Sequence, residues 1–126
     1  MEYLEEVTIA CQRAIDILGV KNITFRPMRR VGNRVNTTRG YVLGRTNLRT
    51  GLITIDVLTP AKREPKKISS VLKVLCHEIA HHQQPPYRQL YRWKWINRQH
   101  YPVFYEQVTK NIIQLKEDKI LSKYFI

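Results

Sequence analysis

The residues best suited to chemistry form the run His-Glu-Ile-Ala-His at positions 77–81. On a helix, His77 and His81 lie on one face about one turn apart and can reach the same metal ion. Glu78 follows the first histidine, where a carboxylate can hold and deprotonate a water molecule at that ion. The spacing H-E-x-x-H therefore predicts a zinc site with Glu78 as general base.

The flanking residues predict the helix that this spacing requires. Ser69 is a good N-cap and Pro85-Pro86 cannot continue a helix, so we expect it to run from about Ser69 to about Gln83. The two histidines fall roughly opposite an apolar face, on a side where a cleft can lie. The alternative interpretation is a solvent-exposed polar face that matches the motif by chance. The apolar face, which we expect to pack on a sheet, consists of Ile68, Val71, Leu72, Leu75 and Ile79.

A catalytic zinc ion usually has three protein ligands and one open position, so a third ligand must come from elsewhere. The extended motif of metzincins would require glycine at 84 and histidine at 87. The chain has Gln84 and Tyr87 instead, which excludes the metzincin class. His100 precedes the last predicted helix, where a side chain can turn into a cleft, and Glu106 lies one turn into that helix. We expect His100 to be the third ligand, with Glu106 as the main alternative. The remaining candidates are Glu117 and Asp118.

Other segments predict the elements around this helix. Apolar residues recur at helical spacing over residues 2–18, and Gly19 marks the end of that first helix. Three β-prone runs follow, at 23–25, 41–43 and 52–58. Residues 87–99 fit either a helix or a strand, and a last helix begins near Pro102. We therefore expect an α+β fold of N-terminal helix, about three strands, motif helix and C-terminal helix, in one domain spanning residues 1–126.

The composition is that of a globular protein with an unusual surplus of positive charge. The 126 residues have a net charge of +12, and 43% of them are hydrophobic. Residues 21–50 contribute +8 without an acidic residue, and residues 81–100 contribute +4. Charge of this size favours polyanions, so we expect non-specific nucleic acid as a partner. The arginines expected to contact phosphates are Arg26, Arg29, Arg30, Arg34, Arg39 and Arg45.

Aromatic and basic residues are interleaved in the second positive segment. In one interpretation the rings stack on bases while the basic residues contact phosphates. In the other, the rings cover the hydrophobic core and the basic residues face the solvent. We expect the second arrangement, because a small domain needs large apolar side chains to close its core. The residues concerned are Tyr87, Arg88, Tyr91, Arg92, Trp93, Lys94 and Trp95.

Several classes of protein are disfavoured. The N-terminus is acidic where a secretory signal would be basic, and no apolar stretch approaches the roughly 20 residues needed to span a bilayer. Cys11 and Cys76 lie in helix-like apolar patterns, so neither indicates a disulfide framework, and we expect Cys76 to be a buried core thiol. We expect a soluble, cytoplasmic monomer without a membrane partner.

The order of these parts resembles a SprT-like zinc metalloprotease domain. The resemblance rests on the strand Gly51-Leu-Ile-Thr-Ile-Asp-Val-Leu, on the run Ser-Ser-Val-Leu-Lys-Val-Leu-Cys-His-Glu-Ile-Ala-His-His, and on the later segment His100-Tyr-Pro-Val-Phe104. It covers about residues 3–115. The chain departs from the family at Tyr101, where members usually have a small residue, and at Pro85-Pro86, which shortens the helix.

The resemblance implies a minimal zincin fold and hydrolysis of peptide bonds. It implies one zinc ion per chain, held by His77, His81 and His100, with Glu78 as catalytic base. In zincins the strand before the motif helix lies along the cleft, so an extended peptide is expected to pair with the edge of residues 52–58. Eukaryotic relatives act on DNA-crosslinked proteins, which fits a basic chain whose substrates are associated with nucleic acid. Candidates for stabilising the oxyanion are Tyr101 and Tyr105.

Two other functions stay open. A regulatory zincin of the ImmA/IrrE type, which cleaves or controls a repressor, would be favoured by Glu106 as third ligand. A non-enzymatic nucleic-acid-binding module would use zinc as a structural staple. Structural sites usually fill four positions with protein ligands, and the chain has no C-x-x-C pair, which makes the staple the weaker alternative.

Overall fold

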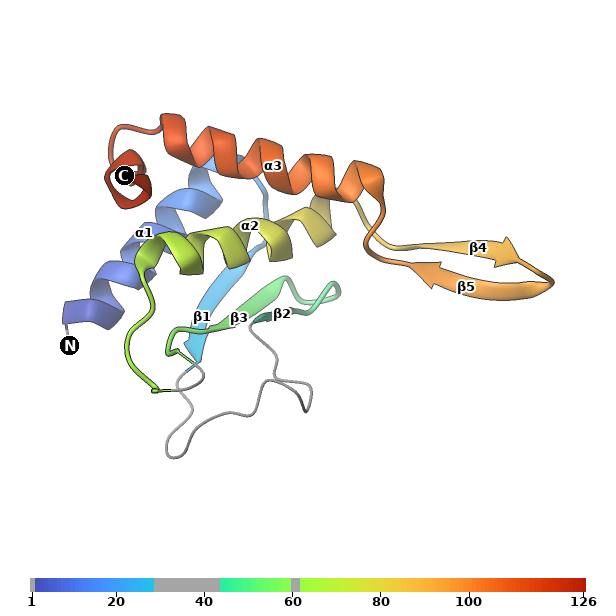
Figure 1. Ribbon diagram of the computed structural model, residues 1–126, viewed down its shortest axis with the longest axis horizontal. Coiled ribbons are helices and arrows are strands. Elements are labelled where there is room, and N and C mark those ends of the chain that lie inside the picture. The colour runs from blue at the N-terminus through green and yellow to red at the C-terminus, as the bar shows by residue number, and fades with distance from the viewer. Residues whose placement is uncertain (1, 29–43, 60–61) are drawn as a thin grey trace.

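The computed structural model describes residues 2–28, 44–59 and 62–126. Figure 1 shows helix α2 between the three-stranded sheet and helix α3, with strands β4 and β5 projecting from this body. The fold is α+β, as the sequence predicts: an N-terminal helix, a mixed sheet, a central helix, a hairpin and a C-terminal helix. The elements are α1 (Glu2–Leu18), β1 (Thr24–Met28), β2 (Gly44–Thr46), β3 (Leu52–Asp56), α2 (Ile68–Gln83), β4 (Tyr87–Tyr91), β5 (Lys94–Arg98), α3 (Pro102–Glu117) and the 3-10 helix η2 (Leu121–Phe125).

The outer helices follow the sequence signals closely. α1 ends at Leu18, and Gly19 follows with a φ of 67°, a left-handed conformation that suits glycine. α3 has Pro102 in its first turn, where a missing amide hydrogen costs no helical hydrogen bond. Both boundaries confirm the predictions.

The start of α2 differs from the prediction. The helix begins at Ile68, and Lys67 occupies the N-cap position without a side-chain cap. The prediction that Ser69 caps the helix is therefore wrong, because Ser69 is already a helical residue. The helix ends at Gln83, where the following Pro85-Pro86 prevents another turn.

The three-stranded sheet has the order β1-β3-β2. β1 is parallel to β3, and β2 is antiparallel to it. Because β3 has a strand on either side, its edges are occupied, and the prediction that a peptide pairs with residues 52–58 is wrong. β1 and β2 are the outer strands within the described parts of the chain. The β-prone run at 41–43 lies outside the described residues, and β2 starts just after it, at Gly44.

The hydrophobic core lies between the sheet, α1 and α2. Ile53 and Ile55 of β3 are fully buried, as are Leu72 and Leu75 of α2 and Val7 of α1. A fully buried aliphatic side chain contributes roughly 1.5–3 kcal/mol relative to an exposed one, so this contact fixes the rotation of α2. The predicted apolar face of α2 therefore faces the sheet and α1, which leaves the histidine face outside this core.

Residues 87–98 form a β-hairpin. β4 and β5 pair antiparallel from Tyr87–Arg98 to Tyr91–Lys94. Arg92 and Trp93 make the turn, with φ values of 50° and 67°. Of the two interpretations that the sequence left open for this connector, the strand is correct.

Candidate metal centre

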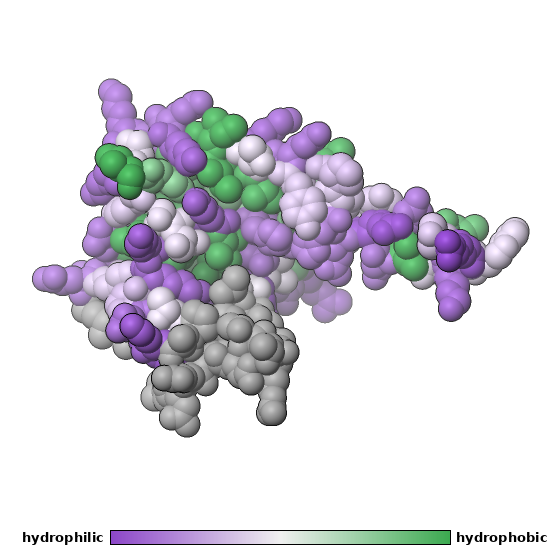
Figure 2. All heavy atoms as spheres, viewed as in Figure 1, coloured by the Kyte–Doolittle hydropathy of each residue, from purple (hydrophilic) through white to green (hydrophobic). Residues whose placement is uncertain are grey.

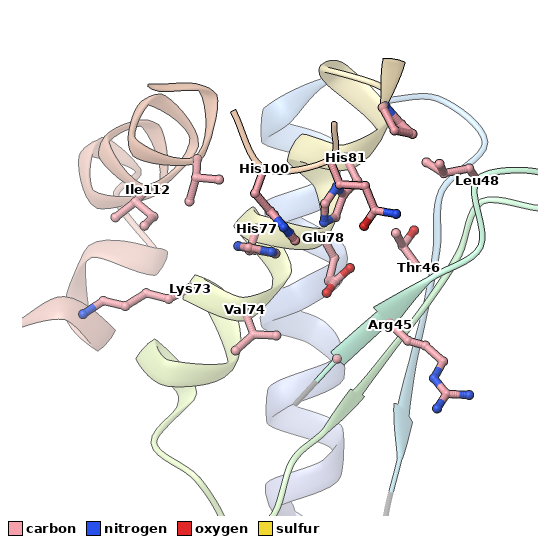
Figure 3. Close-up of a pocket in the computed structure, with 14 residues that line it drawn as sticks. Arg45, Thr46, Leu48, Lys73, Val74, His77, Glu78, His81, His100 and Ile112 are labelled. Atoms are coloured by element: carbon pink, nitrogen blue, oxygen red, sulfur yellow. The ribbon is translucent and has the colours of Figure 1, made fainter. Parts of the chain in front are cut away.

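Three histidines meet beside α2. Their candidate ligand atoms lie within 4.8 Å of one another, so the cluster could hold a metal ion. The ring centroids are separated by 5.1 Å for His77 and His81, 5.2 Å for His77 and His100, and 5.0 Å for His81 and His100. Figure 3 shows the three imidazoles directed toward one another. Nitrogen ligands of tetrahedral zinc are about 3.4 Å apart, so small side-chain rotations bring all three onto one ion.

His100 reaches the cluster because the ends of the hairpin are fastened together. The Tyr101 hydroxyl donates a 2.8 Å hydrogen bond to the carbonyl oxygen of Pro85. The rings of Tyr87 and Tyr101 also meet edge to face, with centroids 5.0 Å apart. Tyr101 thus closes the loop that joins His81 to His100. Its hydroxyl proton is committed to Pro85, which argues against Tyr101 as an oxyanion stabiliser.

Phe104 forms the floor of the cluster. Its side chain is fully buried, and its ring stacks on His81 with centroids 4.5 Å apart. It also meets His77 and His100 edge to face, at 5.0 Å and 5.1 Å. One rigid ring on α3 therefore contacts all three imidazoles and limits their rotation, which favours a preformed ligand arrangement.

The surroundings keep the motif histidines neutral. Burial, followed by the neighbouring His100, lowers the pKa of His77. Burial and the adjacent imidazoles lower the pKa of His81 to about 4. A neutral imidazole has the free nitrogen lone pair that a metal needs, so no proton must leave these two residues for binding near neutral pH.

Glu78 is buried beside the cluster, on the side facing β2. Only 7% of its surface is exposed, and burial raises the pKa of its carboxyl group to about 7. Gly44 of β2 explains how the strand comes so close. A Cβ atom at this position would lie 2.8 Å from Val74 Cγ1 and 3.5 Å from Glu78 Oε1. Only glycine lets the backbone of β2 approach this face of α2 without displacing a side chain.

The cluster opens onto a cavity of about 810 Å³. The cavity lies between the histidine face of α2, strand β2 and the inner side of α3. All three histidines and Glu78 line it, and so do Gly44, Arg45 and Thr46 along β2 (Figure 3). One side of the histidine cluster therefore faces open space, as a metal site with a free coordination position requires.

A buried amide network holds α2 against α3. Asn111 of α3 is fully buried, and its amide donates hydrogen bonds to the Cys76 carbonyl at 3.2 Å and to Gln83 Oε1 at 2.7 Å. Gln107 donates a 3.0 Å bond to Asn111 Oδ1, and Gln84 donates a 3.3 Å bond to Gln107 Oε1. Because Cys76 precedes the first histidine, these bonds set the position of the motif relative to the helix that carries Phe104.

His82 and Cys76, which flank the motif, have structural roles. His82 Nε2 makes a hydrogen bond with Thr46 Oγ1, which ties α2 to β2. Burial raises the pKa of the Cys76 thiol to about 12, as expected for a core thiol. Neither side chain belongs to the cluster that could hold a metal.

The other acidic candidates lie away from the cluster. Glu106 is exposed on α3 and is not part of the histidine group. Asp118 forms a 2.8 Å ion pair with Arg13 of α1, and Glu117 is exposed at the end of α3. Among the described acidic, histidine and cysteine residues, His100 is the one that joins the motif histidines.

The structure describes some of the arginines predicted to contact nucleic acid and all of the hairpin aromatics. Arg26 and Arg45 are exposed on β1 and β2, and Figure 3 shows the Arg45 guanidinium directed away from the histidines. Their predicted contact with nucleic acid stays a prediction. Arg29, Arg30, Arg34 and Arg39 lie outside the described residues. The prediction that the hairpin aromatics cover the core is wrong, because Tyr87, Tyr91, Trp93 and Trp95 are all exposed.

Comparison of the chain with protein families, with curated proteins and with solved structures finds no match. No helix in the described parts of the chain is long and apolar enough to cross a membrane.

Sequence reasoning missed the contribution of β2. Gly44, Arg45 and Thr46 line the cavity, although glycine and arginine are weak strand formers and the β-prone run ends at Leu43. A usable signal is Gly44 directly after a strand-like run, because a glycine in such a pattern often marks a close backbone approach.

Proposed function

We propose that this chain is a zinc-dependent endopeptidase of the SprT-like type. The observation that carries the proposal is the histidine cluster beside a buried glutamate, open to a cavity along an outer strand. Three histidine nitrogen ligands and a free side match a catalytic zinc site. A structural zinc would need a fourth protein ligand, and the group found among the described residues contains only three.

In this proposal His77, His81 and His100 hold the zinc ion. When bound, zinc acidifies a water molecule and polarises the scissile carbonyl group. Glu78 accepts a proton from the attacking water and delivers it to the leaving amine. Phe104 restricts the three imidazoles, and Asn111 keeps α2 and α3 in register.

The substrate in this proposal is an extended polypeptide that lies along β2. Within the described residues no strand pairs with the outer side of β2. Residues of β2 line the same cavity as Glu78. Backbone pairing at a strand edge gives affinity with little sequence preference. The surplus of positive charge favours acidic substrates and proteins associated with nucleic acid.

Zinc content tests the ligand set. We expect one zinc ion per chain in the wild type, loss of zinc in His100→Ala, and retention in Glu106→Ala. Glu106 is a matched control because it lies in the same part of the chain but outside the cluster. Loss of zinc only in Glu106→Ala would instead favour a regulatory zincin with a glutamate ligand. A wild type that takes up no zinc after reconstitution would contradict the proposal.

Cleavage of casein tests the reaction. We expect hydrolysis by the zinc-loaded protein and its abolition by a chelator. Glu78→Gln should keep its zinc and lose about 10²- to 10⁴-fold in rate, the usual contribution of a general base, whereas Glu106→Gln should cleave like the wild type. Equal rates in Glu78→Gln and the wild type would contradict the mechanism even if zinc were bound.

A further inference from the structure

The β4–β5 hairpin exposes an unusual number of aromatic rings. Trp93 is 93% exposed, Trp95 61%, Tyr91 48% and Tyr87 45%. Figure 1 shows the hairpin extending away from the helices and the other sheet. No residue from 87 to 98 lines the cavity of the histidine cluster, although Pro86 and Gln99 at the two ends of the hairpin do. Exposed rings gathered on a projecting element indicate an interaction surface.

The hairpin also has positive charge without any compensating acid. Residues 87–98 contain four basic residues and no aspartate or glutamate. Three of the cations lie over rings: the guanidinium of Arg88 is 5.2 Å from the Trp95 centroid, and those of Arg92 and Arg98 are 5.2 Å and 5.9 Å from that of Tyr91. These cation–π contacts hold the charges next to the aromatic surfaces.

The pairing register distributes rings and cations over the whole hairpin. Tyr87 pairs with Arg98 and Tyr91 with Lys94, so these four side chains share one face. The other face has Trp95 and Arg88, and Trp93 stands in the turn. Each face therefore offers flat rings next to positive charges. Figure 2 shows the projecting arm as a mixture of strongly hydrophilic, intermediate and hydrophobic side chains.

The residues in the turn are not those that its backbone conformation favours. A two-residue hairpin turn with positive φ at both positions favours Asn-Gly, and this chain has Arg92 and Trp93 there. Left-handed backbone at non-glycine residues is strained, and strained residues are enriched at functional sites. The strain therefore points to a role for the side chains at the tip, above all for the most exposed ring.

We infer that the β4–β5 hairpin binds single-stranded nucleic acid, with Trp93, Trp95 and Tyr91 stacking on bases and the basic residues contacting phosphates. A single strand presents a flat base and a negative phosphate in every nucleotide, which matches alternating rings and cations. In a duplex the base faces are covered by their neighbours, so rings gain little there. A membrane-inserting tip would need a continuous apolar surface, whereas this tip reads Tyr91-Arg92-Trp93-Lys94. The inference does not require the chain to be a peptidase.

Intrinsic fluorescence provides a direct test, because the only two tryptophans of the chain are Trp93 and Trp95. The full-length protein is titrated with an oligothymidylate of about 15 nucleotides, the same oligomer in duplex form, and inorganic polyphosphate. We expect strong quenching by the single strand, weaker binding to the duplex, and little quenching by polyphosphate, which has charge but no bases. An oligouridylate distinguishes RNA from DNA as the natural strand. Saturating binding that leaves the fluorescence unchanged would overturn the inference.

Variants then assign the binding energy to rings and charges. Anisotropy of a labelled oligothymidylate should show roughly 5- to 100-fold weaker binding for Trp93→Ala and Trp95→Ala, and affinity close to wild type for Trp93→Phe. Ile113→Ala is the matched control, because Ile113 is exposed on α3, far from the hairpin in sequence. Arg88→Ala should reduce the slope of the logarithm of the binding constant against the logarithm of the salt concentration by about 0.7, the value for one lost phosphate contact. Lys110→Ala on α3 should leave this slope unchanged.

Three further results would overturn the inference. The first is unchanged affinity in both tryptophan variants, which would place binding on other basic segments. The second is equal affinity for single strand and duplex. The third is a blue-shifted fluorescence with phosphatidylserine vesicles and no response to oligonucleotides, which would identify the hairpin as a membrane-surface element. Zinc content and circular dichroism of each variant, measured in parallel, separate these results from a failure to fold or a failure of the metal centre.

Discussion

The histidine cluster and the β4–β5 hairpin are neighbours in sequence and opposites in their surroundings. In the cluster, His77 and His81 are half-buried, and the neighbouring Glu78 is only 7% exposed. In the hairpin, large rings lie in water, and Trp93 is 93% exposed. A buried carboxylate and an exposed tryptophan both depart from the usual distribution of residues, in opposite directions.

The difference shows where the fold obtains its stability. The cluster is built on the core, since Phe104 is fully buried beneath it and Asn111 is buried beside it. The hairpin adds none of the fully buried core side chains. Its aromatic side chains, apart from Tyr87 with its contact to Tyr101, can therefore change with little effect on folding, whereas Phe104 under the cluster cannot. This contrast can be tested by matched substitutions in the two regions.

The largest expected effect is a crossed loss of two activities. Glu78→Gln should lower casein hydrolysis by about 10²- to 10⁴-fold and leave oligonucleotide affinity unchanged. Trp93→Ala should do the reverse, with unchanged hydrolysis and weaker oligonucleotide binding. Both readouts are measured on the same zinc-loaded preparations. A variant that lost both activities would show that the two regions are coupled rather than independent.

The second comparison concerns stability, with an aromatic residue truncated in each region. Phe104→Ala should lower the free energy of unfolding by about 3–5 kcal/mol, because it leaves a cavity beneath three imidazoles. Trp93→Ala should change it by less than about 0.5 kcal/mol, because its ring is exposed. Urea denaturation followed by far-ultraviolet circular dichroism gives both values. Similar losses in the two variants would mean that the hairpin contributes to the core after all.

The third comparison separates a buried amide from an exposed one on the same helix. Asn111→Ala should cost about 1–3 kcal/mol, since it leaves Gln83 and Gln107 without their buried partner. Gln114→Ala should cost less, because its bond to the Ile17 carbonyl is at the surface. Asn111→Ala should also weaken zinc binding, measured by competition with a chromogenic chelator. Unchanged zinc affinity in a folded Asn111→Ala protein would remove Asn111 from the residues that position the motif.

Local signals in the sequence predicted the helices and most of the cluster. Periodic apolar residues and the boundary residues Gly19 and Pro102 defined α1 and α3, and the motif spacing placed two histidines on one face of α2. The α+β fold is thus confirmed. The position of His100 before α3 favours it as the third ligand, and the structure brings it to the other two histidines. Its role as a ligand stays a prediction.

Long-range contacts could not be predicted from these signals. The strand order depends on which edges pair, and nothing local indicated that β3 lies between β1 and β2. Composition alone predicts that the hairpin aromatics are buried, and this prediction is wrong because burial also depends on the pairing register. Once Tyr87–Arg98 and Leu90–Trp95 are known as pairs, cations such as Arg88 and Lys94 lie on both faces, and neither face can be buried.

The hairpin turn gives the smallest expected effect and the most local test of the comparison. The dipeptide Arg92-Trp93 gives no turn signal in the sequence, yet both residues have positive φ. Replacing it with Asn-Gly, through Arg92→Asn and Trp93→Gly, should remove strain of about 1–2 kcal/mol from the hairpin. Amide hydrogen exchange in β4 and β5 should slow by roughly tenfold, while the exchange of α2 amides stays the same, because the hairpin lies outside the core. The same variant should bind oligothymidylate more weakly, since it loses the Trp93 ring and one cation. Unchanged exchange in β4 and β5 would mean that the turn stores no strain, so that exposure and charge alone would distinguish the tip from an ordinary turn.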